Sequence, residues 1–145
     1  MSRKFVESAA VLSNTCLGND VYSLALDAPQ ICWEAKPGQF VGVKTGWEQS
    51  PFLRRPLSVA DAVDGRVIII YRALGVGTNW LSARREGERV DIMGPLGHGF
   101  TLQAKRPLLV GGGIGIAPLL GVARGFAGRS GSGILLAGRN KDEIT

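Results

Sequence analysis

A glycine-rich run near the end of the chain, residues 111–118 (GGGIGIAP), constrains the fold more than any other segment. It follows a short apolar stretch at 107–110 that predicts a β-strand, and it leads into an apolar stretch at 116–126 that predicts a helix. A glycine turn between a strand and a helix lets phosphate groups approach free backbone N–H groups closely. The run therefore predicts the opening βαβ unit of a nucleotide-binding domain, with residues 133–137 as its second strand.

The run departs in two ways from the common dinucleotide-binding pattern. Residues 113–118 read GxGxxP instead of GxGxxG, and the proline suits the first helical turn because its missing N–H has no partner there. Where an acidic residue is expected after the second strand, the chain has Arg139, so the choice between NAD and NADP stays open. The chain ends at Thr145, and we expect a truncated nucleotide-binding domain with an incomplete nicotinamide pocket.

The residues before this unit predict β structure with frequent turns. Short strands recur at regular spacing, which favours a small closed barrel. The expected strands are 4–12, 21–26, 39–44, 57–60, 66–74 and 89–93, with the β-branched segment 66–71 at the centre of its sheet. One helix is expected at 79–85, with Thr78 as its N-cap. We therefore expect a β-barrel domain over residues 1–104, followed by the start of an α/β nucleotide-binding domain over 105–145.

Composition narrows the classes of function. The chain has 17 Lys and Arg against 12 Asp and Glu, a net charge of +5, which suits a phosphate-bearing ligand or an acidic partner. Nucleic-acid binding is not expected, because no run interleaves basic with aromatic residues. Cys16 and Cys32 form no CxxC pair, so we expect no metal site and two thiols in a reducing cytoplasm. The N-terminus lacks a signal-peptide pattern, and no stretch approaches the about 20 apolar residues of a membrane span.

Two segments of the expected barrel carry candidate ligands, and the first is residues 54–58 (RRPLS). Arg54 and Arg55 are adjacent, and neighbouring arginines are costly to bury without an anion. Pro56 removes a backbone donor and predicts a strand edge or a bulge, while Ser58 has a hydroxyl that can donate to a ring nitrogen. The alternative interpretation of this segment is a solvated basic loop.

The second segment is the strand end 70–72 (IYR) and the glycine loop that follows it. Gly75, Gly77 and Thr78 lie between this strand end and the expected helix. A basic residue, a glycine loop and a helix N-terminus together favour a seat for a pyrophosphate group. The alternative is an ordinary glycine turn with a threonine cap.

Taken together and in this order, these segments resemble the ferredoxin-reductase superfamily, in which a flavin-binding β-barrel precedes a nicotinamide-nucleotide domain. Within it the chain is most similar to the electron-transfer subunits of two-component, NAD-dependent dihydroorotate dehydrogenases. The resemblance covers the whole chain and is carried by residues 55–58 (RPLS), 70–72 (IYR), 77–78 (GT), 94–97 (GPLG) and 111–118. The aliphatic residue between Pro56 and Ser58 favours this subfamily over plant-type reductases, which have an aromatic in that segment.

The resemblance implies FAD in the barrel and NAD(H) at the glycine run. Leu57 would lie against the isoalloxazine ring, and Ser58, the implied catalytic residue, would lie near its N5 atom. Gly77 and Thr78 would hold the pyrophosphate. The implied FAD ligands are Arg55, Pro56, Leu57, Ser58, Ile70, Tyr71, Arg72, Gly77 and Thr78, and the implied NAD(H) contacts are Gly112, Gly113 and Gly115.

The resemblance also implies a reaction and a partner. Hydride transfer between NADH and flavin N5 would precede single-electron transfer to an FMN-containing catalytic subunit of pyrimidine biosynthesis. The family's two-iron, two-sulfur cluster needs four cysteines that this sequence does not have, so we expect no cluster in it and little activity of the chain alone. The alternatives are an electron-transfer subunit of hydrogenase or sulfite-reductase type and a non-catalytic basic β-barrel binding module.

Overall fold

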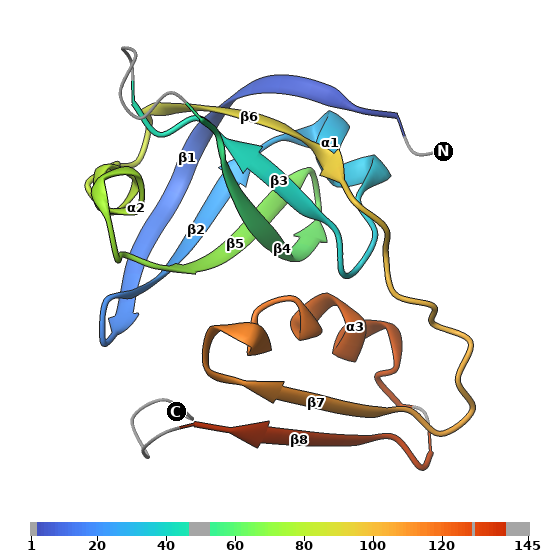
Figure 1. Cartoon of the computed structure of the whole chain (residues 1–145). Helices are drawn as coiled ribbons and strands as arrows, with labels where there is room; N and C mark the ends of the chain where they lie inside the picture. Colours follow the sequence, from blue (N-terminus) through green and yellow to red (C-terminus); the bar gives the residue numbers. More distant parts are fainter. Residues whose placement is uncertain (1–2, 47–52, 129, 139–145) are drawn as a thin grey trace.

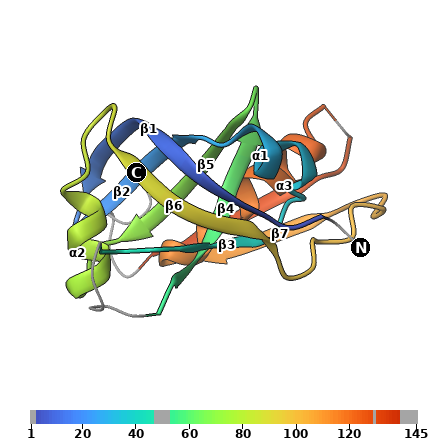
Figure 2. The ribbon, with the colours of Figure 1, turned by 90° about the horizontal axis from the view of Figure 1, so that it is seen from above.

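The computed structural model describes residues 3–46, 53–128 and 130–138. Six antiparallel strands close into a barrel in the order β1-β2-β5-β4-β3-β6, and a parallel pair, β7 and β8, follows (Figures 1 and 2). The barrel strands are β1 (Phe5–Gly18), β2 (Val21–Asp27), β3 (Phe40–Val43), β4 (Arg55–Val63), β5 (Arg66–Arg72) and β6 (Arg89–Leu96). The predicted β-barrel followed by a small α/β part is confirmed.

The barrel closes because β1 pairs with two strands. Its first part, Phe5 to Ala10, pairs with β6, and its second part, from Ala10 to Gly18, pairs with β2. A register shift between Val11 and Ser13 marks the bend between the two parts, as β-bulges commonly do. β5 lies between β2 and β4, and its β-branched residues suit a strand that is paired on both sides.

Alternate residues of the barrel strands point inward and form one core. Val67, Ile69 and Tyr71 of β5 are at most 2% exposed, whereas Ile70 and Arg72 between and after them are half-buried. Burying each large aliphatic side chain in such a core stabilises the fold by about 1.5–3 kcal/mol. The other large, fully buried residues of the core are Val11, Leu24, Leu26, Ile31, Val41, Val43, Leu81, Val90 and Ile92.

A short helix that sequence patterns did not predict, α1 (Pro29–Glu34), packs against β1, β4, β5 and β6 of the barrel. Its residue Ile31 is fully buried. Ala28 at the N-cap has no side chain that can accept a hydrogen bond. The helix is capped instead from β1, where the buried Glu7 carboxylate accepts hydrogen bonds from the backbone N–H groups of Gln30 and Ile31. A cap from a distant strand leaves no local signal.

The helix α2 (Val76–Ser82) begins earlier than predicted, and the assignment of Thr78 as N-cap was wrong. Gly75 is the N-cap, and Thr78 is the third residue of the helix. The Thr78 hydroxyl accepts hydrogen bonds from the backbone N–H groups of Leu74 (2.9 Å) and Gly75 (3.2 Å). The hydroxyl therefore binds N–H groups of the loop before the helix. An N-cap, as predicted, would instead bind N–H groups of the first helical turn.

The predicted βαβ unit is present after the barrel. It consists of β7 (Leu108–Gly112), a 3-10 helix η1 (Gly113–Ile116), α3 (Leu119–Gly125) and β8 (Gly133–Ala137). The α-helix thus begins after Pro118 instead of at residue 116, because the glycine run forms a 3-10 turn first. The predicted domain boundary at 104 falls in the connection between β6 and β7 and stays a prediction. No helix in the described residues is long and apolar enough to cross a membrane.

The unit packs on the barrel through α3, as Figure 1 shows. Gly121 lies so close to β4 that a Cβ atom there would be 3.2 Å from the Ala60 carbonyl oxygen. Arg124 forms an ion pair with Asp61 of the same strand. A side cavity of about 220 Å³ beside this contact is lined in part by Lys36, Asp61 and Arg124.

Candidate functional site

The first candidate segment lies where β4 has a partner on only one side. Residues 55–58 pair with β3, but the pairing of β4 with β5 begins only at Val59 and Ile69. Pro56, which has no N–H to donate, therefore occupies the strand edge that its chemistry predicted. Leu57 and Ser58 are half-buried at this edge.

The second candidate segment lies across from the first. Residues 70–72 of β5 follow Ile69, the last residue of β5 that pairs with β4, and they pair only with β2. The two segments are thus brought to the same place, where β4 and β5 separate. We call residues 55–58 of β4 and 70–72 of β5 the barrel seam. The β4–β5 ladder does not include the residues of this seam.

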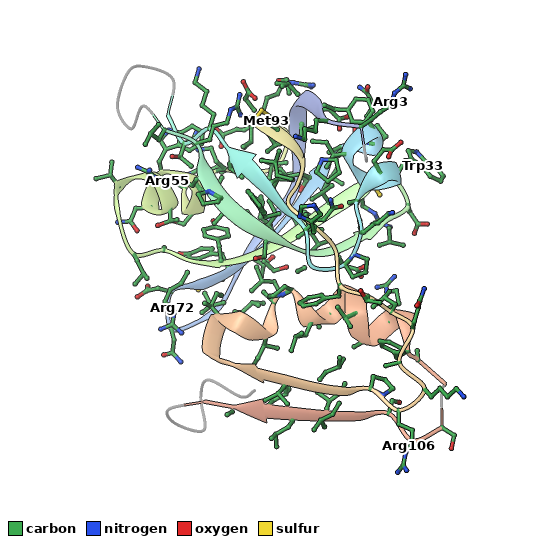
Figure 3. The ribbon with its side chains drawn as sticks, turned by 45° about the vertical axis from the view of Figure 1, so that its right-hand side comes forward. Arg3, Trp33, Arg55, Arg72, Met93 and Arg106 are labelled. Carbon is green, nitrogen blue, oxygen red and sulfur yellow. The ribbon has the colours of Figure 1, made fainter. Side chains whose placement is uncertain are left out.

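The two adjacent arginines differ in their surroundings, which the sequence could not show. Arg54 forms a 2.9 Å ion pair with Asp91 of β6 and also donates to the Gly42 and Asp91 carbonyl oxygens. The anion that Arg54 needs is therefore supplied by the barrel. Arg55 instead lies beside α2, as Figure 3 shows, with its Nε 2.9 Å from where a Cβ on Gly77 would be. Arg55 is the arginine of this pair that is placed toward the second segment.

Tyr71 of the predicted site points away from the seam. Its side chain is 2% exposed, and its hydroxyl donates a 3.2 Å hydrogen bond to the Asn14 side-chain oxygen. Burial raises the pKa of the Tyr71 phenol well above its ordinary value, and the neighbouring Tyr22 adds to this. Asn14 in turn donates to the Leu81 and Arg84 carbonyl oxygens at the end of α2. Tyr71 thus offers the seam its backbone, while its side chain fixes α2 to the barrel.

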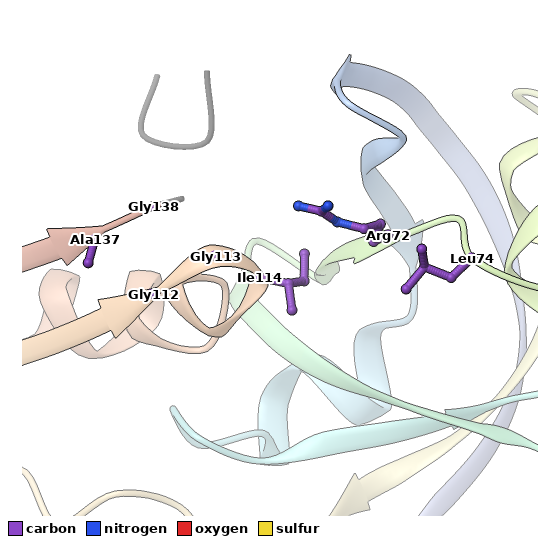
Figure 4. A pocket seen from close by; sticks show the side chains of 7 residues that line it. All are labelled: Arg72, Leu74, Gly112, Gly113, Ile114, Ala137 and Gly138. Atoms are coloured by element: carbon purple, nitrogen blue, oxygen red, sulfur yellow. The ribbon is translucent and has the colours of Figure 1, made fainter. Parts of the chain in front are cut away.

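The glycine run meets the barrel at a cavity of about 530 Å³. Arg72 and Leu74 line it from the barrel, and Gly112, Gly113, Ile114, Ala137 and Gly138 line it from the βαβ unit (Figure 4). Figure 4 shows the Arg72 side chain extending toward the carboxyl ends of β7 and β8, the edge where α/β sheets bind ligands. Residues predicted for the flavin and for the nicotinamide nucleotide thus line one cavity.

Glycine occupies the positions of the run for different structural reasons. Gly111 is packed tightly, since a Cβ there would be 2.7 Å from Leu119 Cδ1. Gly113 has a φ of +52°, which glycine adopts without strain, and nothing lies within 4 Å of its Cβ position. Gly115 is equally open but does not line the cavity. Gly112 and Gly113 are therefore the glycines of the run that line the cavity.

Sequence reasoning missed two residues of this region, Leu74 and Thr45. Leu74 lines the cavity and is 80% exposed. Thr45 follows β3, is fully buried, and lies against Gly77, whose Cβ position is also close to Arg55 Nε. Neither residue belongs to a motif, so no pattern in the sequence distinguishes it. Within the described part of the chain there is no group of three or more His, Cys, Asp or Glu side chains that could hold a metal ion.

Comparison with known proteins gives a consistent result, although no family model matches the chain. The electron transfer subunit of dihydroorotate dehydrogenase B (NAD(+)) from Geobacillus thermodenitrificans is 44% identical over 129 residues, or 85% of this chain and 50% of that protein. The same subunit from Fusobacterium nucleatum is 36% identical over 146 residues, or 96% of this chain and 56% of that protein. The chain is a homologue of these electron transfer subunits.

A solved structure supports the same relationship. The NADH-dependent reduced ferredoxin-NADP oxidoreductase, described for flavin-based electron bifurcation, matches with a TM-score of 0.81 and 30% identity. The match covers 95% of this chain and 51% of that one. The homologue described here therefore has the ferredoxin-reductase-like fold, as its motifs predicted. The chain spans about half the length of the curated relatives it matches.

Proposed function

We propose that this electron-transfer-subunit homologue binds FAD along the barrel seam and takes part in electron transfer from NADH to a partner dehydrogenase. The observation that carries the proposal is the seam itself. Two motifs far apart in sequence meet where β4 and β5 stop pairing, and the glycine run lies across the cavity from Arg72. The residues present fit a dinucleotide, because the Arg55 side chain lies beside Gly77 in the first turn of α2 and Gly113 leaves its backbone open.

The chain's residues have distinct proposed roles toward FAD. Leu57 and Ser58 hold the ring system at the seam, with the Ser58 hydroxyl as the hydrogen-bond donor to a ring nitrogen. The Arg55 guanidinium pairs with the phosphates in a charge-assisted contact. Pro56, Ile70, Tyr71, Arg72, Gly77 and Thr78 complete the proposed FAD site. When bound, the flavin supplies the chemistry that connects two-electron to one-electron steps.

The nicotinamide nucleotide is proposed to lie at the 530 Å³ cavity. Gly112 and Gly113 let it approach the backbone, Gly115 contributes to the turn, and Arg72 gives the cavity a positive charge. Arg139, which follows the second strand of the unit in the sequence, lies outside the described residues.

The proposed partner is an FMN-containing catalytic dehydrogenase subunit of pyrimidine biosynthesis in the cytoplasm. The names of the curated relatives support this partner over the hydrogenase and sulfite-reductase types. Cys16 on β1 and Cys32 on α1 cannot by themselves supply the four thiolates of a two-iron, two-sulfur cluster. The role proposed for this chain is therefore the flavin step.

FAD titration of the purified chain tests the proposal. We expect quenching of flavin fluorescence and saturable binding, with slower flavin reduction by NADH than in the curated relatives, about half of whose length the chain spans. Arg55→Ala should weaken binding by on the order of 2 kcal/mol, or about 30-fold. Arg66→Ala is the matched control, because Arg66 lies in the β4–β5 hairpin and pairs with Asp64. A chain that does not bind FAD would instead support the non-catalytic β-barrel module.

A further inference from the structure

Thr45 holds a buried hydroxyl that the fold does not use. The residue is 0% exposed, and its Oγ1 atom has no hydrogen-bond partner among the described residues. A buried hydroxyl without a partner is costly, and buried polar groups are nearly always paired. Valine would fill the same space without this cost. The presence of threonine therefore points to a state of the protein in which the hydroxyl has a partner.

The surroundings of Thr45 identify that partner. A Cβ placed on Gly77 would be 2.5 Å from Thr45 Oγ1 and 2.9 Å from Arg55 Nε. The hydroxyl and the Nε–H group of the arginine therefore border the same small space beneath the first turn of α2. Glycine at position 77 keeps this space free, because a Cβ atom there would clash with both groups.

We propose that Thr45 is a positioning residue for Arg55. Its hydroxyl accepts a hydrogen bond from Arg55 Nε–H when the guanidinium turns its terminal nitrogens toward a phosphate of FAD. The guanidinium is planar and its N–H groups form a rigid fork, so holding Nε sets the plane of the other donors. Because Thr45 is fully buried, its proposed action on FAD passes through Arg55. This inference rests on the proposed FAD site at the seam.

Replacing the hydroxyl without changing the volume tests the inference. We expect Thr45→Val to raise the Kd for FAD about tenfold, as loss of one hydrogen bond to a charged group predicts. Thermal unfolding of the FAD-free Thr45→Val protein should be unchanged or shifted to higher temperature, since the unpaired hydroxyl is removed. Thr45→Ser keeps the hydroxyl, and its Kd should stay close to that of the wild type. ADP carries the diphosphate but not the isoalloxazine ring, and Thr45→Val should raise the Kd for ADP by the same factor of about ten.

A double-mutant cycle separates positioning from a general structural effect. Arg55→Lys keeps the positive charge but removes Nε–H, so adding Thr45→Val to it should cause no further loss of FAD affinity. The inference is overturned if Thr45→Val leaves the Kd for FAD unchanged, or if it weakens binding equally in the Arg55→Lys background. A wild-type chain that does not bind FAD overturns the proposed function and this inference together. Wild-type binding with an unaffected Thr45→Val variant overturns only the inference.

Discussion

The Glu7 carboxylate on β1 accepts a 2.7 Å hydrogen bond from the backbone N–H of Ile31 in the first turn of α1. Its other oxygen accepts a 3.3 Å hydrogen bond from Gln30 N–H. A strand residue thus provides the cap that Ala28 cannot. Because Glu7 is 9% exposed, this contact is largely shielded from water.

Removing this cap should destabilise the barrel. Glu7→Ala leaves two backbone N–H groups without their acceptor, and we expect the free energy of unfolding to fall by about 1–3 kcal/mol. Urea denaturation followed by circular dichroism measures this. Glu86→Ala, in the exposed turn before β6, is the control and should change stability by less than about 0.5 kcal/mol. Equal losses in the two variants would argue against the cap.

The packing of Gly77 makes a different prediction. Gly77→Ala places a methyl group 2.5 Å from Thr45 Oγ1 and 2.9 Å from Arg55 Nε, so α2 or these side chains must shift. We expect a loss of about 1–3 kcal/mol in stability, as for overpacked cores, and weaker FAD binding. Gly75→Ala is matched to it, because nothing lies within 4 Å of the Gly75 Cβ position and its φ of −161° suits alanine. Identical melting temperatures for Gly77→Ala and the wild type would contradict this packing.

The contact of α3 with the barrel depends on Gly121. In the Arg124–Asp61 ion pair the Arg124 side chain is 59% exposed, and solvent weakens such a pair, so close packing of the helix on Ala60 should dominate. Gly121→Val should push α3 off β4 and speed cleavage by trypsin after Lys105, in the connection between β6 and β7. Leu120→Val adds a β-branched residue on the exposed face of the same turn. Similar cleavage rates for these two variants would show that Gly121 does not hold the unit in place.

The two cysteines should differ in reactivity. Burial raises the pKa of the Cys32 thiol, and the charge of nearby Asp64 adds to the shift, whereas Cys16 is exposed. Because the thiolate is the reactive form, Ellman's reagent at about pH 8 should titrate Cys16 quickly and Cys32 only after unfolding. A raised pKa favours the protonated thiol in the folded protein. Its contribution to stability is therefore complete below the unfolded-state pKa and is lost as pH rises through the folded-state pKa. Two thiols reacting at one rate in the native protein would contradict this.

Much of the fold could be predicted because the signals are local. Alternating residues and glycine turns located β2, β3, β5, β7 and β8 to within about two residues, whereas β6 ends three residues later than predicted. β1 continues to Gly18 and β4 begins at Arg55, beyond their predicted ends, because pairing with neighbouring strands extends them. α1 was missed because six residues show no clear helical period and its cap comes from Glu7, far away in sequence.

The residues of the candidate site that belong to sequence motifs could be predicted, whereas those that are placed by packing could not. The motifs pointed to Arg55, Arg72 and Gly113, and the fold brings their segments to the seam and the adjoining cavity. Thr45 had no signal, since its importance lies in an unpaired hydroxyl that only the three-dimensional packing reveals. Strand alternation predicts that Tyr71 and its neighbours point to opposite faces of the strand. It does not predict which face is the core, and the structure shows that Tyr71 is on the buried face.

The pairing of β1 with β6 has a consequence for how the protein is made. The first part of β1 pairs with β6, which ends at Leu96. This part of β1 therefore has no such partner until Leu96 has left the ribosome. Throughout that interval the nascent chain presents an open strand edge, which other chains can pair with. Slow translation between β5 and β6 should therefore lower the yield of folded protein more than an equal pause after Leu96.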